Sequence, residues 1–214
     1  MSDDPVLPVL HALRLRSFAT VDVLADRSGL APEVVRSTLR EADRSGWARH
    51  RDGRLSGWSL SADGRAHAQE LLARQLDAAG ARPAVEDAYH RFLGLNGELL
   101  SVCTDWQVVL VDGAERVNDH TDTAHDHSVL ARLDELHQAS RPVTADLAGA
   151  LDRFGAYPGR LEAAHDRVRA GDVEWLTKPM IDSYHTVWFE LHEDLLATLG
   201  RERSQEQSVS GAPT

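Results

Sequence analysis

Seven of the eleven histidines lie between His120 and His192, and the densest group occupies residues 119–127, with the sequence Asp-His-Thr-Asp-Thr-Ala-His-Asp-His. Neutral imidazole and carboxylate side chains together can bind a borderline metal such as zinc. The spacing of this segment matches no strong zinc motif. A solvated acidic loop or a helix cap is therefore the favoured interpretation, with a metal site as the alternative.

Three further histidines stand at helical spacing beside large apolar side chains. His185 and His192 border a stripe that includes Trp188, and His137 borders a similar stripe in residues 129–136. We expect all three to face the interior of one helical bundle, where a buried imidazole needs a partner. That partner is either a neighbouring side chain, as in an ordinary core histidine, or a divalent metal or an anionic small molecule. The candidate ligand residues are His137, His185, Trp188 and His192.

Catalysis is the competing use for these histidines and acids, but no catalytic motif assembles from them. The sequence contains no glycine-rich phosphate loop, no nucleophile elbow and no His-Glu-x-x-His helix. Its one cysteine, Cys103, lies in an apolar run and is interpreted as a buried, inert thiol. We predict that the protein is not an enzyme, and a metal-dependent enzyme is the less favoured alternative.

The charge of −11 is distributed unequally along the chain. Residues 1–76 carry 11 arginines against 10 acids, a balance of +1, whereas residues 77–214 carry 12 basic residues against 24 acids, a balance of −12. The phosphate backbone attracts positive charge and repels negative charge. Only the first part of the chain is therefore suited to approach nucleic acid.

The arginines of this first part concentrate between residues 36 and 54. Arg36 and Arg40 are one helical turn apart, so both could reach one DNA groove, where an arginine can donate two hydrogen bonds to a guanine edge. Arginines that flank a hairpin tip would instead meet phosphates. An arginine-rich face that is simply solvated is the alternative. The candidate DNA-binding residues are Arg36, Ser37, Arg40, Arg44, Arg49, Arg51 and Arg54.

Local signals predict the elements that would position these arginines. Apolar spacing predicts a first helix from residue 6 to about 18, and Thr20 is a candidate N-cap for a second that ends at Ser28-Gly29. Pro32 suits the first turn of a third helix, which ends near residue 45. Strands are predicted over residues 47–51 and 55–60, with Asp52-Gly53 as the hairpin turn. Three helices and a β-hairpin make a winged helix.

Residues 25–45 resemble a helix-turn-helix, and Leu60-Ser61-Ala62-Asp63-Gly64-Arg65 resembles the segment that leaves the wing in MarR- and PadR-type transcriptional regulators. The resemblance covers residues 6–76. It implies that the helix over residues 32–45 enters the major groove and that the hairpin lies along a neighbouring groove or phosphate strand. Glu33 and Glu41 temper the positive potential of that helix, which favours a dimer on a two-fold DNA site.

The rest of the chain is predicted to be helical. A helix over residues 62–76 leaves the wing, Gly80-Ala81-Arg82-Pro83 interrupts it, and a broad apolar face follows over residues 84–103. Residues 105–111 could be a helix end or a strand, and we favour a continuing helix. The further helices are predicted over residues 129–138, 144–154, 160–170 and 180–199.

These patterns predict a mainly α protein in which a winged helix is followed by an all-α domain. The expected boundaries are 1–80 for the DNA-binding domain, 81–203 for a helical dimerisation and ligand-sensing domain, and 204–214 for a disordered tail. The first residues are acidic and lack the features of a secretory signal, and no apolar run is long enough to span a membrane. We therefore expect a cytoplasmic protein without a membrane partner.

The sequence thus predicts a sequence-specific DNA-binding transcriptional regulator that binds double-stranded DNA as a homodimer. Its helical domain is expected to sense a small-molecule effector or a metal. The alternative is a protein-interaction module in which the winged helix docks on a partner enzyme.

Overall fold

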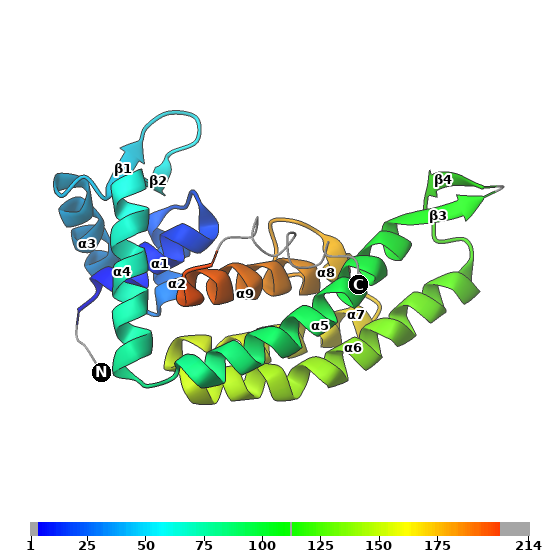
Figure 1. Ribbon diagram of the computed structural model, residues 1–214. Helices are drawn as coiled ribbons and strands as arrows, with labels where there is room; N and C mark the ends of the chain where they lie inside the picture. The colour runs from blue at the N-terminus through cyan, green and yellow to red at the C-terminus, as the bar shows by residue number, and fades with distance from the viewer. Residues whose placement is uncertain (1–3, 112, 202–214) are drawn as a thin grey trace. The chain divides into compact units, whose positions relative to one another are not determined.

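The computed structural model describes residues 4–111 and 113–201, and within these ranges the chain is mainly helical (Figure 1). The predicted tail, residues 204–214, lies outside the described residues. Among the helices in the described ranges, none is long and apolar enough to cross a membrane.

The chain divides into two compact units. The first contains the residues up to Ala78 and resumes at Leu196, and the second runs from Ala79 to Leu195. The division lies close to the boundary expected at residue 80, where Gly80 takes a left-handed conformation with φ of 60°. The expected second domain continued to residue 203, whereas residues 196–201 group with the first unit.

The first unit begins with three helices, and local signals explain where they start and stop. The Thr20 side chain accepts the backbone N–H of Val23, as predicted for an N-cap, and Gly29 ends the second helix in the left-handed conformation. Pro32 lies in the first turn of the third helix. The elements are α1 (Val6–Arg16), α2 (Val21–Ser28), α3 (Pro32–Arg44), β1 (Ala48–Arg51), β2 (Gly57–Leu60) and α4 (Ala62–Ala78).

Strands β1 and β2 form an antiparallel hairpin in which Ala48 faces Leu60, and Ala19 forms an isolated bridge with Trp58. Helices α1, α3 and α4 contact this hairpin (Figure 1). The core between them is apolar and closed to solvent, so it holds α3 and the hairpin in a defined arrangement. It includes Val9, Leu10, Leu13, Leu24, Val35, Leu39, Ala42 and Ala68.

The start of α4 is fastened to the end of α3 by a serine and a glycine. Ser61 Oγ donates to the carbonyl oxygen of Gly46 at 2.6 Å and accepts the N–H of Gly64 at 2.9 Å. A Cβ at Gly64 would lie 1.9 Å from the carbonyl oxygen of Trp47, so the close approach requires glycine. Ser61 and Gly64 therefore have a direct packing role at the start of α4.

The first unit also includes the end of the last helix. The side-chain amide of Gln69 on α4 donates to the carbonyl oxygen of Ala197 at 2.6 Å and accepts a hydrogen bond from Arg14 of α1 at 2.9 Å. One glutamine thus connects the first helix of the chain with its last.

The second unit is built on two long helices that run side by side, α5 and α6, and a two-stranded hairpin at one end connects them (Figure 1). Shorter helices complete its core. The buried large side chains include Tyr89, Phe92, Leu133, Phe154 and Tyr184. The elements are α5 (Arg82–Gln107), β3 (Val108–Val111), β4 (Ala114–Val117), α6 (Thr123–Ala150), the 3₁₀ helix η1 (Asp152–Phe154), α7 (Tyr157–Arg169), α8 (Glu174–Thr177) and α9 (Tyr184–Leu199).

The structure corrects two predictions for this unit. Residues 108–111 form strand β3 instead of continuing the helix, so the unit is not all-α. In the hairpin Val108 pairs with Val117, and Gly113 has the positive φ that a tight turn needs. The helices predicted over residues 129–138 and 144–154 are one helix, α6, up to Ala150. Pro142 lies inside α6, where buried side chains continue at helical spacing on both sides and their packing outweighs a cost of roughly 3 kcal/mol.

Candidate functional site

Helix α3 presents its candidate DNA-binding side chains on the face opposite the core. Arg36, Ser37, Arg40 and Arg44 are exposed, while Val35, Leu39 and Ala42 are buried. Within residues 4–111 and 113–201, no ion pair involves Arg36 or Arg40. The Ser37 hydroxyl donates to the carbonyl oxygen of Val34 at 2.9 Å, so it is held against its own helix.

Arg44 differs from the other two arginines of α3, because it already has local partners. Its guanidinium lies 3.9 Å from the Glu41 carboxylate, and its Nε donates to the carbonyl oxygen of Arg40 at 3.3 Å. Both side chains of this ion pair are well exposed, so the pair contributes little to stability and can open.

The β1–β2 hairpin carries the remaining candidates. Arg49 and Arg51 on β1 and Arg54 in the connecting loop are all exposed. Next to them, His50 Nδ1 lies 3.2 Å from the Asp52 carboxylate, and the His50 ring packs on Trp58 with the ring centres 4.8 Å apart. The structure thus brings the predicted arginines onto two elements of one unit, α3 and the hairpin.

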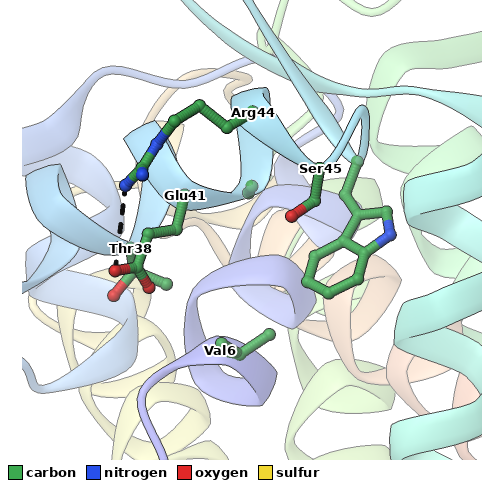
Figure 2. A pocket seen from close by; sticks show the side chains of 7 residues that line it. Val6, Thr38, Glu41, Arg44 and Ser45 are labelled. Carbon is green, nitrogen blue, oxygen red and sulfur yellow. Dashed lines mark ion pairs between the residues drawn. The ribbon is translucent and has the colours of Figure 1, made fainter.

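A pocket of about 390 Å³ lies beside α3 (Figure 2). Val6, Ala42 and Trp47 contribute apolar side chains to its lining, and its charged residues are Glu41 and Arg44, which pair with each other. Trp47 also stacks on His67 of α4, with ring centres 3.8 Å apart. This hollow offers no charged group that lacks a partner, and we assign it no ligand.

The second unit contains a pair of histidines held by two carboxylates. The rings of His137 on α6 and His165 on α7 stack with centres 4.1 Å apart and planes 6° from parallel. His137 Nε2 lies 3.2 Å from Glu162 of α7, and His165 Nε2 lies 2.8 Å from Asp134 of α6. Each helix therefore supplies one histidine and the carboxylate that holds the other. We call these four residues the histidine clasp.

His165, Asp134 and Glu162 were not among the predicted site residues. Each acid precedes a histidine of its own helix by three residues, Asp134 before His137 and Glu162 before His165, and so lies on the same helix face. This repeated spacing was a signal that could have found the clasp.

His137 also connects to the last helix. Its Nδ1 lies 3.4 Å from the hydroxyl of Tyr184, the first residue of α9. His137 itself is only 2% exposed. Burial and the neighbouring charge of His165 lower the pKa of His137, and the hydrogen bond to Glu162 opposes this shift. Burial raises the pKa of the Tyr184 hydroxyl. A neutral His137 that donates to Glu162 and accepts from Tyr184 satisfies all three groups.

The other predicted ligand residues lie elsewhere in the unit. Trp188 stacks on Phe92 with ring centres 4.6 Å apart and donates its indole N–H to Asn96 at 3.0 Å. His192 is buried and packs against Phe92, with ring centres 5.2 Å apart. His185 is half-buried, and burial lowers its pKa.

The histidine-rich segment over residues 119–127 caps a helix, as the favoured interpretation predicted. Asp122 accepts the backbone N–H groups of Ala124 and His125 and so caps α6, while His120 Nδ1 lies 3.0 Å from Asp126. Across the described parts of the chain, no group of three or more His, Cys, Asp or Glu side chains could hold a metal ion.

A buried network of charges joins α7 to α9. Arg160 donates two hydrogen bonds to Glu190, at 3.0 and 2.9 Å, and a third to Asp182 at 3.1 Å. Burial lowers the pKa of Arg160, but the hydrogen bonds and charges of Glu190 and Asp182 outweigh it and raise the pKa overall. The network extends through Tyr157, whose hydroxyl donates to Asp194 at 3.0 Å. We interpret this network as structural, because its charged and polar groups form hydrogen bonds with one another.

Cys103 is buried, as predicted, and burial raises the pKa of its thiol to about 12. The thiolate form that a nucleophile or metal ligand needs is therefore disfavoured. Comparison of the sequence and structure with protein-family models, curated proteins and solved structures gives no match.

Proposed function

We propose that this protein is a sequence-specific DNA-binding transcriptional regulator whose first unit acts as a winged helix. The observation that carries the proposal is the exposure of Arg36 and Arg40, one turn apart on α3, without a carboxylate partner among the described residues. Side chains in this arrangement can enter a major groove together and donate to guanine edges. The hairpin arginines would contact phosphates.

The low charge of the first unit supports a dimer. One copy presents few positive groups, and Glu33 and Glu41 lie on the same helix as the arginines. Two copies on a two-fold site would double the number of contacts and add their binding free energies.

Fluorescence anisotropy with a DNA fragment from upstream of the protein's own gene tests this function. The titration is repeated at several salt concentrations with the Arg36→Ala/Arg40→Ala variant and with random DNA. We expect binding that weakens steeply with salt, and a loss of preference over random DNA in the variant.

Arg74→Ala is the matched control, because Arg74 is an exposed arginine of the same unit that already pairs with Glu70 at 3.5 Å. Its affinity and its preference should stay close to those of the wild type. If no fragment binds, even after selection from the whole genome, the alternative of a module that docks on a partner enzyme takes precedence.

A further inference from the structure

A pocket of about 590 Å³ lies between α6 and α7. His137, Ser140, Thr144 and Leu161 form its buried floor, and Arg141 stands at its exposed rim. Apolar atoms of Pro142, Ala145 and Pro158 contribute to the walls. The pocket is thus large enough for a small organic molecule, and it has one basic and one apolar side.

A carboxylate already occupies the polar side of this pocket. Glu162 Oε2 lies 3.2 Å from His137 Nε2 and 3.7 Å from Arg141 Nε. The Glu162 side chain is 44% exposed, so it is held weakly and can turn toward solvent. If it did so, a buried ring N–H and a guanidinium would be left facing the pocket, and both are donors suited to a carboxylate.

The hydroxyl groups on the floor do not compete for this role. Ser140 Oγ donates to the carbonyl oxygen of His137 at 2.8 Å, and Thr144 Oγ1 donates to that of Ser140 at 3.2 Å. Their protons are therefore committed to the helix. Recognition of an anion would depend on His137 and Arg141.

We propose that this pocket binds a small organic acid, whose carboxylate replaces that of Glu162 between His137 and Arg141 and whose apolar body lies along the proline and leucine side. Glu162 would then act as a built-in competitor of the ligand. The inference extends the proposed function by naming the chemical class of its effector, but it is tested without DNA, so either proposal can fail alone.

Calorimetric titration of the whole protein with hexanoate, hexylammonium and inorganic phosphate tests the proposal. We expect saturable binding of hexanoate at one site, and no saturable binding of hexylammonium. Phosphate, which lacks an apolar body, should bind more weakly than hexanoate. Arg141→Gln should weaken hexanoate binding by about tenfold or more, whereas Glu162→Gln, which removes the competing charge, should strengthen it by about tenfold.

Gly159 provides a variant that blocks the pocket without changing a donor. It lines the pocket on α7, and a Cβ there would meet no atom within 4 Å, so a side chain can be added at this position, and we expect that of Gly159→Leu to occupy part of the pocket. Gly149→Leu is the matched control, because Gly149 is equally unobstructed but lies outside the pocket. Hexanoate binding should be lost in the first variant and kept in the second.

Three results would overturn the proposal. These are the absence of saturable hexanoate binding at millimolar concentration, binding that Gly159→Leu and Arg141→Gln leave unchanged, and preferential binding of hexylammonium that requires Glu162. Thermal unfolding of each variant shows whether it is folded, and Arg141→Gln, an exposed substitution, keeps the test valid if Gly159→Leu does not fold.

Discussion

The imidazole rings of His137 and His165 stack almost parallel, with centres 4.1 Å apart, although each belongs to a different helix. Two neutral imidazole rings can stack in this way without electrostatic repulsion. Protonation of His137 is opposed by its burial and by the neighbouring charge of His165, even though its Nε2 lies 3.2 Å from Glu162. The contact between α6 and α7 should therefore respond to acid.

We predict that His137 makes the protein less stable in mild acid. Because burial lowers the pKa of His137 in the folded state, the unfolded state binds its proton first as the pH falls through about 6.5. The stability from His137 is thus complete above that pH and is lost below it, until the folded-state pKa is reached. Urea unfolding at pH 7.5 and 5.5 measures this loss, which should shrink in His137→Gln.

His127→Gln is the control for this prediction, because His127 is an exposed histidine of the same helix. It should retain the acid sensitivity of the wild type. An equal sensitivity in His137→Gln and in the wild type would show that the clasp does not cause it.

We predict that Gly64→Ala is strongly destabilising. The added methyl group would lie 1.9 Å from the Trp47 carbonyl oxygen, and relief of that clash must move α4 away from the end of α3. We expect a loss of about 3 kcal/mol in the free energy of unfolding. Gly97→Ala, in an open position of α5, should instead raise it by about 0.5 kcal/mol. Chemical denaturation of both variants checks the contrast.

We predict that removal of one partner from the Arg160–Glu190 pair costs more than removal of both. Arg160→Met removes the guanidinium that pairs with the Glu190 carboxylate, which is only 7% exposed. The free energy of unfolding should therefore fall by roughly 3–5 kcal/mol. The double variant Arg160→Met/Glu190→Leu should recover a large part of this loss. If the double variant were as unstable as the sum of the two single variants, the pair would not be coupled.

We predict that the hairpin and α3 contribute differently to DNA binding. Arg51→Ala should weaken binding to the preferred fragment and to random DNA by a similar factor, and should reduce the slope of log affinity against log salt by about 1. Arg40→Ala should reduce mainly the preference. Anisotropy titrations at several salt concentrations separate the two effects, and an equal loss of preference in both variants would contradict the assignment.

The local signals of the first unit were sufficient to predict its elements. Thr20, Gly29 and Pro32 act within one turn of the chain, and their effect on a helix end does not depend on distant residues. The strand over residues 108–111 was missed because a short apolar run fits a helix end as well as a strand, and only its partner, Ala114–Val117, decides between them.

The candidate ligand residues show that local sequence patterns also do not identify the tertiary partner of a side chain. Periodicity correctly indicated that His137 and His192 are buried, since burial follows from the face of a helix. It could not indicate that His137 meets His165 instead of His192, because that depends on which helices are neighbours. The partner of a buried polar group is a property of the tertiary structure.

The hydrogen bond from Gln69 to Ala197 can form only late in the synthesis of this protein. The acceptor is encoded 128 residues after the donor. At a synthesis rate of about 5–20 residues per second, α4 waits on the order of 10 s on the ribosome before the end of α9 exists. During that time the newly made first unit lacks its C-terminal segment, so a chaperone or an early partner would meet Gln69 before its acceptor has been made.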